Sequence, residues 1–307
     1  MSAFASAIGR DELADPAGDA GNPDAAQDLY GLGIRLGLYF QVLGWIFYSL
    51  GGGKGLKLAS VSITIPILVT WFLFASKQLF SPCEAFIVLV LLSSLNFPAK
   101  ATLYNDSKEM VRETTGVIML LLVELGICGA LLWLFATLVK SLPTLLTENA
   151  AFFFAKVPLN GWFRFLALVY CAFDAATSLY SCFRVGHVFI LYYRFKRSKS
   201  IEDILKEKEF GDQNTNNNDS ASNQGKDKRH LNYFSHALHC IVLVLAVLAV
   251  ELTIKWNHLV PITDFQSPGQ LIPFTAGIII LADSIFVLGN RIIGTGTTKD
   301  TKSSASP

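Results

Sequence analysis

The chain has 307 residues, of which 52% are apolar and only 16% charged, and its formal net charge is +1. Soluble domains carry about 25% charged residues, and the mean hydropathy of this chain is +0.44. These values exclude an ordinary soluble fold and a nucleic-acid-binding protein. They favour an all-α, polytopic bundle of transmembrane helices with the lipid bilayer as its partner.

Residues 1–27 form an acidic tail rich in Ala, Asp, Gly and Pro. The tail contains no apolar core of the kind found in a signal peptide, and we expect it to be disordered. The first span, 28–47, must therefore direct membrane insertion itself.

Three glycines share one face of this first span. Gly33, Gly37 and Gly44 lie at i, i+4 and i+11, which places them within a stripe of roughly 40° on a helix. Small residues let two helices approach closely, so we expect this face to pack against a neighbouring span or, in a homo-oligomer, against a second copy. Arg35 points to the other side near the start of the span, so its side chain is expected to reach the lipid headgroups, with a buried functional charge as the alternative.

Six further apolar runs approach or exceed the roughly 20 residues that a hydrocarbon core requires. They are 58–76, 82–99, 115–139, 162–193, 233–256 and 271–293. The run 162–193 exceeds the required length, so it either projects from the membrane or contains two segments. Seven spans are therefore predicted in one helical domain over 28–293, with six or eight as alternatives.

The longest connection, 194–230, begins with the basic sequence RFKRSKS and ends in a run rich in Asn and Ser. It has too few apolar residues to fold, so we expect a flexible cytosolic loop. Its basic start either binds anionic lipid or only supplies the positive charge of a cytosolic loop. The C-terminal tail, 294–307, is also expected to be disordered.

Lys and Arg predict the orientation, because cytosolic connections carry an excess of both. Seventeen of these residues fall on the side that includes the long loop and the C-terminal tail, and five fall on the side that includes the N-terminus. The N-terminus is therefore predicted outside the cell or in a lumen, and the C-terminus in the cytosol. The membrane is either the plasma membrane or an endomembrane.

Ionisable side chains inside apolar spans are costly and are therefore candidate functional residues. Asp174 and Ser178 share a face of the fifth span, and Asp283 and Asn290 lie at i and i+7 on the seventh. Together with Glu124 of the fourth span they are the candidates for a buried polar cluster. Asp174 and Asp283 have matching depths, counted from the outer ends of their spans, so we expect these two carboxyl groups to face each other.

Such a cluster has two interpretations. Carboxyl groups that exchange protons near the middle of the membrane would form a proton or ion path. Alternatively, each carboxyl group is protonated or paired and ties helices together.

A metal site would need His236, His239 and Asp283, since imidazole and carboxylate groups are zinc ligands. The two histidines are three residues apart, with no HExxH or CxxC pattern around them, so no metal or other cofactor is predicted. The sequence also contains no GxSxG, phosphate-binding glycine loop or dinucleotide fingerprint. Its five cysteines lie in or beside apolar runs and indicate no disulfide framework.

Two stretches carry a resemblance to other proteins. DLYGLGIRLGLYFQ at 28–41 and GQLIPFTAGI at 269–278 resemble a group of multi-span membrane proteins from filamentous fungi that have no assigned activity. The resemblance implies a helical membrane fold and implies no catalytic residue.

The sequence therefore predicts an integral membrane protein without an identified catalytic apparatus. We expect a sensor or a small-solute or proton permease. The alternative is a membrane-embedded, metal-dependent hydrolase that uses the histidines of the sixth span.

Overall fold

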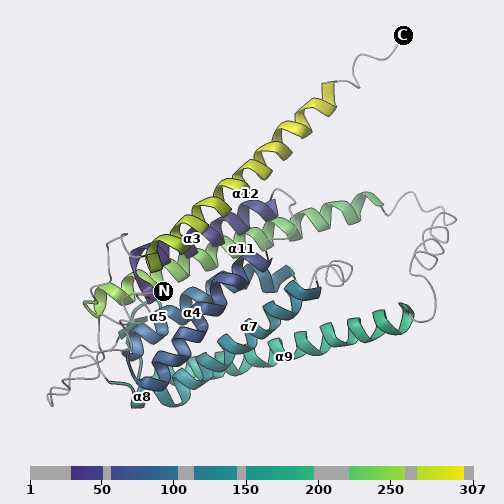
Figure 1. Cartoon of the computed structure of the whole chain (residues 1–307). Coiled ribbons are helices and arrows are strands. Elements are labelled where there is room, and N and C mark those ends of the chain that lie inside the picture. The colour runs from purple at the N-terminus through teal and green to yellow at the C-terminus, as the bar shows by residue number, and fades with distance from the viewer. Residues whose placement is uncertain are drawn as a thin grey trace, which may run out of the picture.

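The computed structural model describes residues 29–50, 57–102, 114–143, 150–196, 221–259 and 268–300. The fold is all-α, as predicted, apart from a short antiparallel hairpin (Figure 1). In chain order the elements are α3 (Leu32–Leu50), α4 (Lys57–Lys77), α5 (Pro82–Thr102), α7 (Thr114–Trp133), the π-helical turn η1 (Leu134–Leu138), α8 (Val139–Ser141), β1 (Ala150–Phe152), β2 (Lys156–Pro158), α9 (Trp162–Lys196), α11 (Ala221–Trp256) and α12 (Pro268–Asp300).

The described part of the chain has a long helix at each of the seven predicted apolar runs. Five helical segments are long and apolar enough to cross a membrane: Pro82–Lys100, Thr114–Ser141, Trp162–Tyr192, His236–Trp256 and Pro268–Ile292. The apolar part of α4, Val61–Lys77, is shorter. The helix α3, predicted as the first span, is not among the five.

Several helices extend beyond their apolar runs. α9 continues to Lys196, α11 begins at Ala221 and α12 continues to Asp300, so parts of the predicted loop 194–230 and of the predicted tail 294–307 are helical. Backbone hydrogen bonds can continue a helix through polar sequence. The pattern of apolar residues therefore does not predict where such a helix ends. The predicted tail 1–27 lies outside the described residues.

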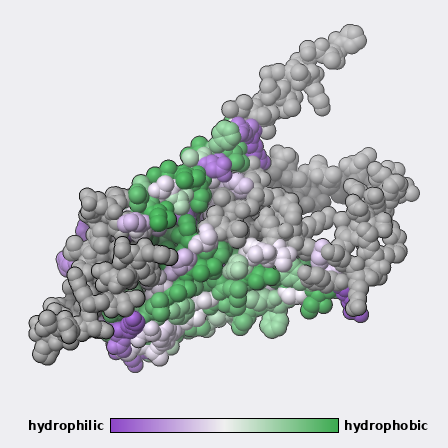
Figure 2. Space-filling model, viewed as in Figure 1, coloured by the Kyte–Doolittle hydropathy of each residue, from purple (hydrophilic) through white to green (hydrophobic). Residues whose placement is uncertain are grey.

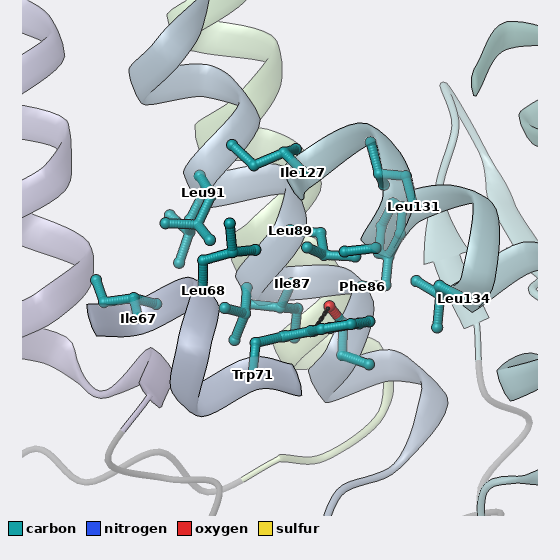
Figure 3. Packing of buried hydrophobic residues seen from close by; sticks show 14 of the residues in the cluster. Ile67, Leu68, Trp71, Phe86, Ile87, Leu89, Leu91, Ile127, Leu131 and Leu134 are labelled. Carbon is teal, nitrogen blue, oxygen red and sulfur yellow. Dashed lines mark hydrogen bonds between the residues drawn. The ribbon is translucent and has the colours of Figure 1, made fainter. Parts of the chain in front are cut away.

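The helix α5 is the most buried of the five apolar segments and contacts α3, α4, α7 and α11. Its start is fixed by a capping box: Ser81 N donates to Glu84 Oε2 (2.7 Å), and Glu84 N donates to Ser81 Oγ (3.4 Å). Beside this end, the indole N–H of Trp71 donates to the Ala85 carbonyl (3.1 Å) within the apolar core shown in Figure 3. The first two bonds fix the start of α5, and the Trp71 bond joins that end of α5 to α4.

Glycines bring α3 and α12 into backbone contact. A Cβ atom placed on Gly37 would lie 2.3 Å from the Pro273 carbonyl oxygen, and one placed on Gly277 would lie 2.4 Å from the Gly37 carbonyl oxygen. Gly33 and Gly44 face the same helix. The glycine face therefore packs against α12 of the same chain.

The two ends of α3 are also bonded to α12. The Gln270 side-chain oxygen accepts hydrogen bonds from Gly33 N (3.0 Å) and Ile34 N (3.3 Å), which have no partner within their own helix. At the other end, the Arg291 guanidinium donates to the Leu50 carbonyl. α12 thus satisfies backbone groups at both termini of α3.

The outer surface of the bundle is strongly apolar. Most residues in the apolar segments of α9, α11 and α12 are not buried, and Val169, Phe173 and Phe183 on α9 are exposed. Figure 2 shows hydrophobic residues along the flank of the bundle, with hydrophilic residues mainly toward its ends. Water is a poor solvent for a surface of this kind.

Candidate functional site

A cluster of polar side chains lies where α5, α7 and α9 meet. Lys100 comes from the last turn of α5 and Glu124 from the middle of α7, while Asp174 and Ser178 are one turn apart on α9. Cys128 lies one turn after Glu124 on α7. Residues at i and i+4 share a helix face, so α7 and α9 each direct two polar side chains toward Lys100.

The Lys100 ammonium joins the three helices. Its Nζ donates to Glu124 Oε1 (2.5 Å), to Asp174 Oδ1 (2.6 Å) and to Ser178 Oγ (3.1 Å). The exposed fractions of the side chains are 15% for Lys100, 11% for Glu124 and 24% for Asp174. All three donor positions of the ammonium are thereby used within a largely buried site.

Ser178 and Cys128 complete the network. The Ser178 hydroxyl donates to Glu124 Oε1 (3.2 Å), and the Cys128 thiol donates to Asp174 Oδ2 (3.3 Å). Cys128 Sγ also lies 3.6 Å from Ser178 Oγ. Each carboxylate therefore accepts a bond from the ammonium and another from a neutral group.

The contacts restrict the chemistry of the site. A Ser–Lys nucleophile needs a neutral amine as base, but Lys100 donates to two carboxylates, which stabilise its charged form. Glu124, Cys128 and Asp174 offer ligand atoms within 4.8 Å of one another, as a metal site would. Lys100 Nζ already binds the two carboxylates of that group, so the cation in this geometry is the ammonium.

A second ion pair, between the buried Arg35 and the partly exposed Glu251, links α3 to α11. Arg35 is only 4% exposed, and its NH1 nitrogen donates to both carboxylate oxygens of Glu251 at 2.5 Å. The Tyr39 hydroxyl donates to Glu251 Oε1 at 3.2 Å. The prediction that Arg35 reaches the headgroups is therefore wrong, because a carboxylate on the neighbouring helix lies within its reach.

The predicted site residues divide into two groups. Glu124, Asp174 and Ser178 come together, whereas Asp283 and Asn290 are exposed on α12. The expected pairing of Asp174 with Asp283 is not found, since Asp174 binds Lys100. α12 directs its glycine face toward α3, and that rotation turns Asp283 and Asn290 away from the bundle interior.

The histidines of α11 form no metal site with Asp283. The rings of His236 and His239 have centroids 6.5 Å apart, and His239 also packs edge-on against Phe97 at 5.5 Å. Among the described residues, the group with metal-site geometry contains neither histidine. The structure therefore offers nothing in favour of a hydrolase built on these two residues.

Lys100 and Cys128 are the members of the cluster that sequence reasoning missed. Lys100 follows the predicted span 82–99 directly and was counted as a positive charge of a connection, but α5 continues to Thr102. The signal for Cys128 is its i+4 spacing from Glu124, which places both on one face. No family model, curated protein or solved structure matches this chain, so function has to be argued from this cluster.

Proposed function

We propose that this protein is a multi-pass integral membrane protein that acts as a proton permease through the cluster of Lys100, Glu124 and Asp174. The five apolar helices and the apolar flank of the bundle support membrane residence. The Lys and Arg distribution supports an N-terminus outside and a C-terminus in the cytosol.

Glu124 and Asp174 lie well within their apolar segments, whereas Lys100 is the last residue of the segment Pro82–Lys100. Glu124 is ten residues from the start of the segment Thr114–Ser141, which is about 15 Å at 1.5 Å per residue. Asp174 is twelve residues from the start of the segment Trp162–Tyr192, which is about 18 Å on the same scale. Both carboxyl groups would therefore lie inside a hydrocarbon core roughly 30 Å thick.

The observation that carries the proposal is that two carboxylates share one ammonium. With both carboxyl groups ionised, the cluster has a net charge of −1. A net charge in a medium of low dielectric constant costs several kcal/mol, and one bound proton cancels it. The cluster is therefore an internal proton-binding site that needs no further side chain.

Asp174 is the group that we expect to take the proton. Its side chain is more exposed than those of Lys100 and Glu124. Among the described residues, its Oδ2 atom accepts a hydrogen bond from the Cys128 thiol, which is a weak donor. Protonation of Oδ2 weakens the attraction between Asp174 and Lys100 and leaves Lys100 with Glu124 as a neutral pair. α9 is then held less tightly to α5.

Pro98 makes the end of α5 adjustable. It lies two residues before Lys100 and has no N–H group to donate to the carbonyl four residues earlier. The turn that carries Lys100 therefore has one fewer helical hydrogen bond. Proton occupancy can in this way change the ion-pair link between α9 and α5, which is the two-state element that a permease requires.

The test is proton flux into liposomes that contain the purified protein and a trapped pH-sensitive dye. Asp174→Asn keeps the shape and an oxygen that can accept from Lys100, but it cannot exchange a proton, so it should abolish the flux. Glu251→Gln, which neutralises the other paired carboxylate, is the matched control and should retain it. Flux no greater than that of empty liposomes for the wild type would reject proton transfer, and full flux in Asp174→Asn would reject this site.

A further inference from the structure

The hairpin of β1 and β2 presents an aromatic side chain in a strained position. Residues 153–155 connect the strands, in which Phe152 pairs with Lys156. Phe154, at the tip, has a φ of 55° and is 74% exposed. A bulky residue seldom adopts this left-handed conformation, which persists only where the surroundings hold the backbone in place.

Hydrogen bonds to α11 supply that support. Asn257 Nδ2 donates to the Ala150 carbonyl (2.6 Å), and Asn257 Oδ1 accepts from Ala150 N (2.9 Å). Thr253 Oγ1 accepts from Phe152 N (3.3 Å). The first strand is thus fixed to the end of α11, and the tip is held by a rigid base.

The depth of the hairpin follows from its contacts. The Phe152 ring lies 6.0 Å from the ring of Trp256, the last residue of one apolar segment. The Phe153 ring lies 6.1 Å from that of Trp162, the first residue of another. The hairpin therefore lies where two apolar segments end.

Its composition matches that depth. Trp162 is 56% exposed, and aromatic rings of this kind concentrate at the headgroup level of membranes. Lys156 and Lys255 are exposed close to the aromatic cluster, where ammonium groups can meet lipid phosphate. The exposed apolar surface continues along α9 through Phe165 and Val169.

We infer that this hairpin is a lipid anchor, with Phe154 inserted below the phospholipid headgroups of the outer leaflet. The inference rests on the membrane residence proposed above, but not on proton transfer. A phospholipid boundary is the occupant that fits, because the patch is continuous with the apolar flank of α9 and has lysines at its edge. A protein partner would instead leave the tip shielded from both lipid and water.

The experiment places an environment-sensitive fluorophore on single cysteines of the full chain in phosphatidylcholine nanodiscs. Cys182→Ala and Cys240→Ala remove the native thiols that are not buried. The probe is attached at Phe154→Cys, with Phe173→Cys on the exposed face of α9 as the lipid control and Ser2→Cys as the aqueous control. Quenching by lipids with a nitroxide near the headgroup, and for position 173 by lipids with a nitroxide deep in the acyl chain, is compared with quenching by aqueous iodide.

The expected result is strong nitroxide quenching and weak iodide quenching at position 154. Iodide quenching equal to that at position 2 would place the tip in water and overturn the anchor. Protection from both quenchers would mean that protein covers the tip, which also overturns it. If nitroxide reached neither position 154 nor position 173, membrane residence itself would be wrong, whereas quenching at 173 alone would reject only the anchor.

Discussion

Gly37→Ala tests the contact between α3 and α12. The added Cβ would lie 2.3 Å from the Pro273 carbonyl oxygen, 2.5 Å from the Pro273 carbonyl carbon and 2.7 Å from Phe274 N. Ordinary contact begins at 3.4 Å, so the two backbones must separate by roughly 1 Å in an interior that is closely packed. Because all three atoms belong to the backbone, no side-chain rotation can relieve the clash, and overpacking should cost about 1–3 kcal/mol.

The control must account for the helix propensity of alanine, which is favourable over glycine by about 1 kcal/mol. Gly129 on α7 and Gly289 on α12 have nothing within 4 Å of an added Cβ, so Gly129→Ala and Gly289→Ala carry the propensity gain without the clash. The midpoint of heat denaturation, followed by size-exclusion chromatography of detergent-solubilised protein, should be lower for Gly37→Ala than for either control. A midpoint equal to theirs would refute close packing at Gly37.

Two further variants follow from other contacts, and a tagging experiment follows from the charge distribution. Lys100→Met leaves Glu124 and Asp174 without their cation, so unfolding should become easier by about 3–5 kcal/mol at neutral pH; a loss below 1 kcal/mol would show that water screens the cluster. Gln41→Met should raise the denaturation midpoint. Gln41 is 0% exposed, and neither polar atom of its side chain has a partner in the described part of the chain. Removing a buried unsatisfied polar group should stabilise the fold by about 1–3 kcal/mol. A tag at the C-terminus should resist protease added outside intact cells while one at the N-terminus is removed; the reverse pattern would invert the proposed orientation.

The sequence predicts positions along each helix better than it predicts rotation about the helix axis. Glu124, Asp174 and Ser178 were identifiable because a polar group in an apolar helix needs a partner, and they do lie together. Asp283 met the same criterion and lies on the exposed side of α12. Depth in the membrane is encoded by distance from the ends of an apolar run, whereas the direction that a residue faces depends on which other helix packs beside it.

Charge patterns were informative as totals and misleading for individual residues. Lys100 counted as one positive charge of a connection, yet it binds two carboxylates. Arg35 lies near the start of a span, as a headgroup-binding residue would, yet it pairs with Glu251, 216 residues later. A long charged side chain can extend to solvent or to a partner that is distant in the sequence. A single sequence does not reveal whether such a partner lies within reach in the folded chain.

The pairing of α3 with α12 has a consequence for the order of assembly during synthesis. The bond from Gly33 N to Gln270 joins residues 237 positions apart, an interval that a ribosome covers in roughly 10–50 s at about 5–20 residues per second. Until then the glycine face of the first helix has no neighbour from its own chain. α3, the first long helix of the described residues to be synthesised, therefore keeps its glycine face uncovered until α12 is made, and a chain truncated before α12 exposes that face.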